Sequence, residues 1–154
     1  MRYISKINKT IMRHIKIYEA FNIDEEYKRS DISGLFGGPE DVSFRQDTIR
    51  IKALLWIYKY QTEDEKQDLI TSHLNGVGFT GPDSYILSSF AKQVIEKYYL
   101  SEKQLQIVRK KIKKYENQMV KIANAIQSGE AQKDPNIESV MEEWKSRNAG
   151  RYSS

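Results

Sequence analysis

Five lysines in the second half of the chain have the chemistry to bind phosphate groups. If residues 101–127 form a helix, these side chains project roughly opposite its apolar residues, at about 100° per residue. The segment holds seven Lys/Arg against two Glu, whereas the whole chain has a net charge of only +4. A solvated lysine face can serve solubility alone, but this concentration of charge favours binding to a polyanion. The predicted phosphate-binding side chains are Lys103, Lys110, Lys113, Lys114 and Lys121.

The element that must position these lysines is a long amphipathic helix. Ser101, followed three residues later by Gln104, is a capping box that begins the helix, and Gly129 suits its end. We therefore predict one helix over 101–127. Its apolar stripe packs on the chain's own core or, alternatively, on a second copy, so that a homo-oligomer through 105–126 is possible. The stripe has the alternating spacing of three and four residues that marks a heptad, at Leu105, Val108, Ile112, Tyr115, Met119, Ile122 and Ile126.

A glycine-rich turn is the second candidate for phosphate binding. The sequence Leu-Asn-Gly-Val-Gly at 74–78 lies between two predicted helices, and it resembles the turn of helix–hairpin–helix DNA-binding proteins. In that family, backbone N–H groups at the start of the second helix hold a DNA phosphate. We therefore add Gly76 and Gly78 to the predicted nucleic-acid interface. The alternative is a purely structural turn, because four residues intervene before the next helix and Asp83 brings negative charge there.

The remaining pattern predicts an all-α protein, a compact helical bundle. Segment 49–60 is ambiguous, since its β-branched and aromatic residues also suit a strand. We favour a helix because no second strand is evident, and an unpaired strand would leave its backbone groups unsatisfied. The helices at about 83–99 and 101–127 should pack as an antiparallel hairpin, because the turn between them is short. Further helices are predicted at 3–21, 44–60 and 62–74, the last begun by a capping box at Thr62.

The C-terminal region is predicted to differ from the core. We expect a single helical domain over 1–127, with an N-terminal arm at 1–39 and a core at 40–127, followed at 128–154 by a linker, a short helix and a flexible tail. Asp134-Pro135 can begin that helix. Its apolar face either binds a groove on another protein or folds back onto its own domain. The predicted partner-binding residues are Ile137, Val140, Met141 and Trp144.

Nothing in the sequence suggests catalysis. The chain has no cysteine, and its two histidines, His14 and His73, are far apart. No nucleotide-binding, metalloprotease, hydrolase or calcium-binding motif occurs. We therefore expect no enzymatic activity, no catalytic residue, no metal ligand and no cofactor. The absence of cysteine and of a long apolar run predicts a cytoplasmic protein without a membrane span, in the host cytoplasm if the protein is viral.

One region resembles a small helical module of bacterial and phage DNA helicases and related DNA-metabolism proteins. The likeness covers roughly 70–124, and Thr80, Phe90, Ser101 and Met119 depart from the module's pattern. No helicase motor is present, so the resemblance implies an accessory or targeting module used on nucleic acid. The matching residues are Asn75, Gly76, Val77, Gly78, Phe79, Asp83, Ser89, Ala91, Gln93, Leu100, Lys103, Gln104, Lys114, Tyr115 and Gln118.

These observations predict a non-enzymatic, phage-encoded accessory protein that binds DNA or RNA during replication, repair or recombination. Five phosphate contacts would make the logarithm of affinity fall with the logarithm of salt concentration at a slope of roughly −4. The alternative is an adaptor or inhibitor that binds a replication, helicase or host-defence protein. The sequence does not choose between DNA and RNA, or between one strand and two.

Overall fold

The computed structural model describes residues 36–66 and 76–152, and every regular element in these residues is helical. The α-helices are α3 (Phe44–Lys66), α4 (Pro82–Lys97), α5 (Glu102–Lys111), α6 (Glu116–Ser128) and α7 (Pro135–Asn148). Two 3₁₀-helices, η2 (Ile112–Tyr115) and η3 (Ala149–Tyr152), follow α5 and α7. The all-α prediction is confirmed. The predicted helix at 3–21 and the end of the one at 62–74 lie outside the described residues.

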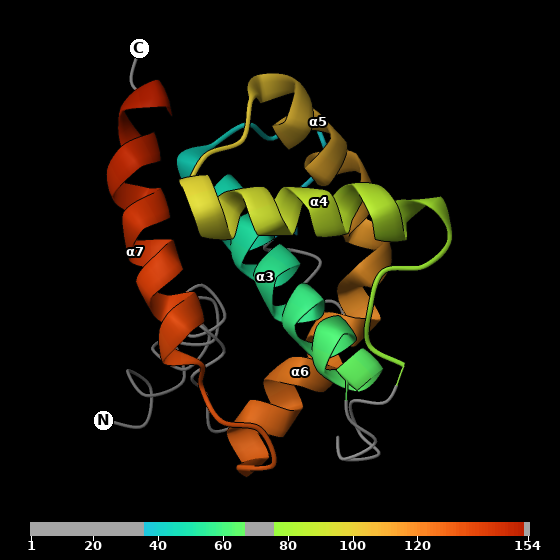
Figure 1. The fold of residues 1–154 in the computed structure, drawn as a ribbon. Coiled ribbons are helices and arrows are strands. Elements are labelled where there is room, and N and C mark those ends of the chain that lie inside the picture. The colour runs from blue at the N-terminus through green and yellow to red at the C-terminus, as the bar shows by residue number, and fades with distance from the viewer. Residues whose placement is uncertain (1–35, 67–75, 153–154) are drawn as a thin grey trace, which may run out of the picture.

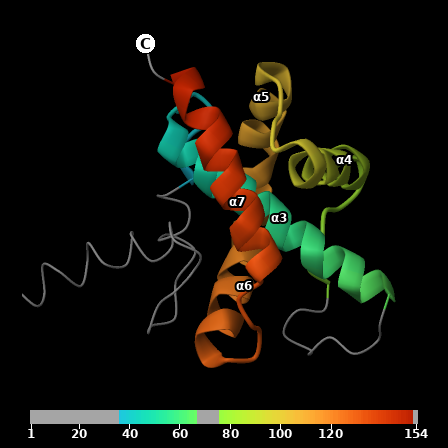
Figure 2. The same cartoon turned by 60° about the vertical axis from the view of Figure 1, so that its left-hand side comes forward.

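The centre of the fold is α3, and the other helices pack around it (Figures 1 and 2). Every residue from position 47 to position 57 is buried. A helix that is buried on all sides has no polar face, and therefore its sequence lacks the usual helical periodicity. This explains why 49–60 could be interpreted as a strand; the preferred helix is confirmed.

The predicted break in this helix at Thr62 is wrong, because α3 continues without interruption to Lys66. The Thr62 hydroxyl does not cap a new helix. It donates to the carbonyl of Lys59 at 2.9 Å, inside the same helix. A Ser/Thr-x-x-Glu pattern within a helix is therefore not sufficient to begin a new one when tertiary packing favours continuation.

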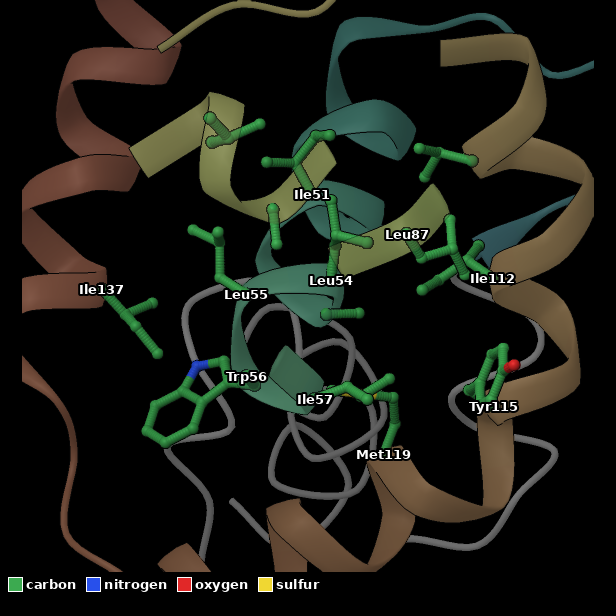
Figure 3. Close-up of a cluster of buried hydrophobic side chains, with 14 of the residues drawn as sticks. Ile51, Leu54, Leu55, Trp56, Ile57, Leu87, Ile112, Tyr115, Met119 and Ile137 are labelled. Carbon is green, nitrogen blue, oxygen red and sulfur yellow. The ribbon is translucent and has the colours of Figure 1, made fainter. Parts of the chain in front are cut away.

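The core is formed where side chains of α3 meet those of the surrounding helices. Figure 3 shows Ile51, Leu54 and Leu55 of α3 among residues of α4, η2 and α7. Trp56 lies beside Ile137 in the same view. No helix in the described parts of the chain combines the length and apolar character needed to cross a membrane.

The hairpin of α4 and α5 is antiparallel, as predicted. Near the connecting turn, the amides of Gln93 and Gln104 exchange hydrogen bonds of 3.0 and 2.9 Å. Far from the turn, Asp83 at the start of α4 meets Lys111 at the end of α5. The predicted capping box is also present, because the Ser101 hydroxyl accepts from the backbone of Gln104 and the Gln104 side chain accepts from the backbone of Ser101.

The predicted single helix over 101–127 is wrong in one respect, since η2 divides it into α5 and α6. Figure 1 shows that the chain changes direction between α5 and α6, so the two do not form one straight rod. The heptad residues nevertheless face the chain's own core: six of them are buried, from Leu105 to Ile122, and Ile126 is partly buried. The stripe is therefore not available as a seam between two copies along 105–126.

Helix α7 packs antiparallel to α3 and shares its core. Asp134 caps it by accepting from the backbone of Asn136 and Ile137. Lys59 pairs with Asp134 near one end of α3, and Lys52 pairs with Glu138 about two helical turns earlier along α3. Residues 149–152, predicted as part of a flexible tail, instead form η3 and contact the core through Tyr152.

Candidate nucleic-acid interface

Four of the five predicted phosphate-binding lysines are exposed, and their ammonium groups have no carboxylate partner among the described residues. Lys103 and Lys110 lie on α5, Lys113 lies on η2, and Lys121 lies on α6. Among the described residues, no carboxylate lies within ion-pair distance of these four ammonium groups, since the salt bridges of this region involve other side chains. An exposed ammonium group without an internal partner can bind an external anion without first breaking a bond within the protein.

The fifth lysine, Lys114, is exposed but pairs with a carboxylate of the protein itself. Its Nζ atom lies 2.6 Å from Oδ2 of Asp83, and Lys111 Nζ lies 2.8 Å from Oδ1 of the same carboxylate. Hydrogen bonds from Lys111 and Lys114, together with one from Tyr115, lower the pKa of Asp83 to about 2 although burial opposes the shift. We leave Lys114 out of the proposed contacts as a correction, because its ammonium group is already paired with Asp83, although this one carboxylate offsets only one of the two lysine charges.

The two lysines lie where the α-helix passes into the 3₁₀-helix: Lys111 is the last residue of α5, and Lys114 lies in η2. In a 3₁₀-helix, side chains three residues apart eclipse each other. Lys111 and Lys114 have that separation, and both reach the one buried carboxylate of Asp83. Tyr115 also donates to Asp83, at 2.9 Å. We infer that these contacts to α4 favour the break that separates α5 from α6.

The glycine turn is structural, because the backbone of its second glycine is already hydrogen-bonded. The side chain of Gln118 accepts from the N–H of Gly78 and donates to its carbonyl, both at 2.9 Å. The next two N–H groups donate to Gln61 at 2.7 Å and to the Tyr115 hydroxyl at 3.1 Å. No N–H of 78–80 is left to hold a phosphate.

The conformation of this turn favours glycine at positions 76 and 78 over a residue with a side chain. Gly76 has a φ of 82°, which side chains rarely adopt. A Cβ at Gly78 would lie 3.2 Å from the side chain of Gln61. We therefore remove Gly78 from the predicted interface in favour of the structural alternative that the sequence had left open. The positive φ of Gly76 does not decide between the two alternatives, and its role in binding stays a prediction.

The residues that carry the resemblance to a helicase-associated module bind mainly to one another. Gly78 pairs with Gln118, and Asp83 pairs with Lys114 and Tyr115. Gln93 pairs with Gln104 across the hairpin. These contacts therefore hold the turn at 76–81 against the helical hairpin.

The predicted partner-binding residues are not on the surface. Ile137, Val140, Met141 and Trp144 are all buried, and α7 packs against α3. Of the two alternatives for this helix, the one in which it folds back onto its own domain is found. A protein-binding function would need another surface.

A buried charge network was missed by the sequence analysis. The carboxylate of Asp47 accepts from Arg50 at 2.7 Å, from Arg109 at 3.0 and 2.6 Å, and from the Tyr152 hydroxyl at 2.6 Å. Burial alone would raise the pKa of Asp47, but these hydrogen bonds lower it below its ordinary value. The available signal was Arg50 inside an apolar run, since an arginine is rarely buried without a partner.

This network also joins separate segments of the fold. Arg50 also donates to the carbonyls of Phe36, Gly38 and Asp41, which fastens the start of the described chain to α3. In the described residues, no group of three or more histidine, cysteine, aspartate or glutamate side chains is arranged to hold a metal ion.

Comparison with known proteins gives no further identification. The chain matches no protein-family model, and no curated protein or solved structure is significantly similar to it. The resemblance of 70–124 to a helicase-associated module therefore stays a prediction.

Proposed function

We propose that the protein is a non-enzymatic accessory protein that binds nucleic acid through the phosphate backbone. The contacts come from the four available lysines of α5, η2 and α6, which are Lys103, Lys110, Lys113 and Lys121. The observation that carries the proposal is the contrast within this one segment: Arg109, Lys111 and Lys114 are paired with carboxylates of the protein itself, whereas these four are left exposed and unpaired among the described residues.

The number of available lysines sets the strength and character of the binding. Four phosphate contacts release about four counterions from a duplex, or about three from a single strand, so affinity depends strongly on salt. Contacts to phosphate carry no base information. The proposed activity is therefore binding with little sequence preference, as suits an accessory factor in phage replication, repair or recombination.

The proposal is tested by two double variants that change the net charge equally. Lys110→Gln with Lys113→Gln removes two charges from the proposed interface. Lys92→Gln with Lys133→Gln removes two exposed lysines that lie elsewhere, on α4 and in the loop before α7. Binding of a fluorescent oligonucleotide is followed by anisotropy over a series of salt concentrations.

The interface variant should bind more weakly, and its dependence on salt should be shallower by roughly 1.4 to 1.8 in the slope of log affinity against log salt. The matched control should keep the slope of the unaltered protein. If both double variants lose affinity equally, net charge alone explains the binding, and the proposed interface does not exist.

A further inference from the structure

Two consecutive tyrosines at the turn between α4 and α5 are held in an unusual arrangement. Tyr98 ends α4 with a φ of 56°, and among the described residues it is the one non-glycine residue with positive φ. This conformation reverses the chain between the helices and directs Tyr99 outward. The side chain of Tyr99 remains 49% exposed, although it is a large aromatic group.

An arginine guanidinium from the C-terminal end of the described chain lies over the ring of each tyrosine. The guanidinium carbon of Arg147 lies 4.9 Å from the ring centre of Tyr98, and that of Arg151 lies 4.7 Å from the ring centre of Tyr99. Both distances are within the range of a cation–π contact. Asn148 also donates to the carbonyl of Tyr98 at 3.0 Å, which holds the end of α7 against the turn (Figure 1).

The Arg151 guanidinium is fixed in place. Its Nη1 atom donates to the carbonyl of Leu100 at 2.7 Å and to the side chain of Asn148 at 2.9 Å. Arg151 is nevertheless exposed as a residue, as is Tyr99. The pair therefore presents a cation and an aromatic ring that are already ordered, and binding a flat ligand would cost little further ordering.

We propose that Tyr99 and Arg151 form a stacking platform for an unpaired base, so that the ligand is single-stranded nucleic acid; this inference rests on the proposed function. Aromatic and arginine side chains are the groups on which single-stranded bases stack. A base inside a duplex is stacked on both sides already and cannot use such a platform. The exposed ring would therefore make the protein prefer single-stranded over double-stranded nucleic acid. Phosphate contacts alone do not provide this preference.

The platform lies close to the proposed phosphate contacts. Lys103 follows Tyr99 by four residues, so their backbones are at most about 14 Å apart. Glu102 is paired with Arg109, which limits its repulsion of a phosphate. Glu96 is exposed and would repel a strand running along α4, which directs the strand toward Lys103.

The chain offers a matched control in Tyr85 of α4. Its side chain is 87% exposed, and no described cation lies over its ring. The test compares Tyr99→Leu, Tyr99→Phe and Tyr85→Leu in the full chain. The probes are a labelled single-stranded oligodeoxynucleotide, an oligomer of the same length made of abasic sites, and the duplex, all at one low salt concentration. Thermal unfolding confirms that each variant is folded.

The unaltered protein should bind the single strand at least about fivefold more tightly than the abasic oligomer, since stacking contributes to the first alone. Tyr99→Leu should remove that preference and leave affinity for the abasic oligomer unchanged, whereas Tyr99→Phe and Tyr85→Leu should retain it. Equal losses from Tyr99→Leu and Tyr85→Leu, or equal binding of both single-stranded probes by the unaltered protein, would overturn the platform while leaving the phosphate interface intact. If no probe binds, the proposed function fails, and the platform fails with it.

Discussion

Replacing Gln118 with methionine separates the structural interpretation of the glycine turn from the phosphate-binding one. The two side chains have similar length, but methionine cannot replace the hydrogen bonds that Gln118 makes to the N–H and carbonyl of Gly78, both at 2.9 Å. Gly78 is buried, and a buried polar group left without a partner costs about 1–3 kcal/mol. Gln118 itself is only partly buried, so water can offset some of the loss. We expect Gln118→Met to lower the free energy of unfolding by about 2–4 kcal/mol.

Urea denaturation at neutral pH measures this loss, and Asn117→Ala is its control. Asn117 is the exposed neighbour on α6, and a surface substitution there should change stability by less than about 0.5 kcal/mol. At a temperature at which both variants are folded, both should bind an oligonucleotide as the unaltered protein does. The reasoning is refuted if Gln118→Met is as stable as the unaltered protein and binds the oligonucleotide more tightly, because the released N–H of Gly78 would then hold phosphate.

Two further predictions concern buried carboxylates. Asp47→Asn should lower the free energy of unfolding by about 3–5 kcal/mol, because it leaves buried Arg50 without a counterion and buried Arg109 with the half-exposed Glu102 alone. Glu102→Gln should cost less than about 1 kcal/mol by the same urea assay, because the Glu102 carboxylate is half exposed. The contribution of Asp83 to stability should be present above about pH 4 and lost as pH falls toward 2, since its pKa is lowered from 3.8 to about 2 in the folded protein. Thermal unfolding between pH 5 and pH 2 should therefore show a smaller loss of stability for Asp83→Asn, and an equal loss would contradict the assignment.

The features that the sequence predicted correctly depend on neighbouring residues. The capping box of Ser101 and Gln104 and the cap provided by Asp134 are contacts within three residues, so their chemistry is visible in the sequence. The heptad stripe likewise identified the buried face of α5 and α6. The exposure of Lys103 and Lys110 followed from that face, because the opposite side of an amphipathic helix meets solvent.

The errors arose where a distant segment decides the outcome. Lys114 belonged to the expected charged face, but the carboxylate that pairs with it lies on another helix, at Asp83. We infer that the same contact favours the break at η2. Gly78 was assigned to phosphate, whereas its actual partner, Gln118, is forty residues further along the chain. Trp144 could bind a partner or its own domain, and only the position of α3 settles that choice.

The central claim, that four lysines contact phosphate, is tested most directly by the salt dependence of binding. The affinity of the unaltered protein for a single-stranded oligonucleotide is measured from about 50 to 200 mM salt. Four contacts predict a slope near −3 in log affinity against log salt, which is a loss of roughly 50-fold over this range. A flat response, or no binding at the lowest salt concentration, would contradict the account.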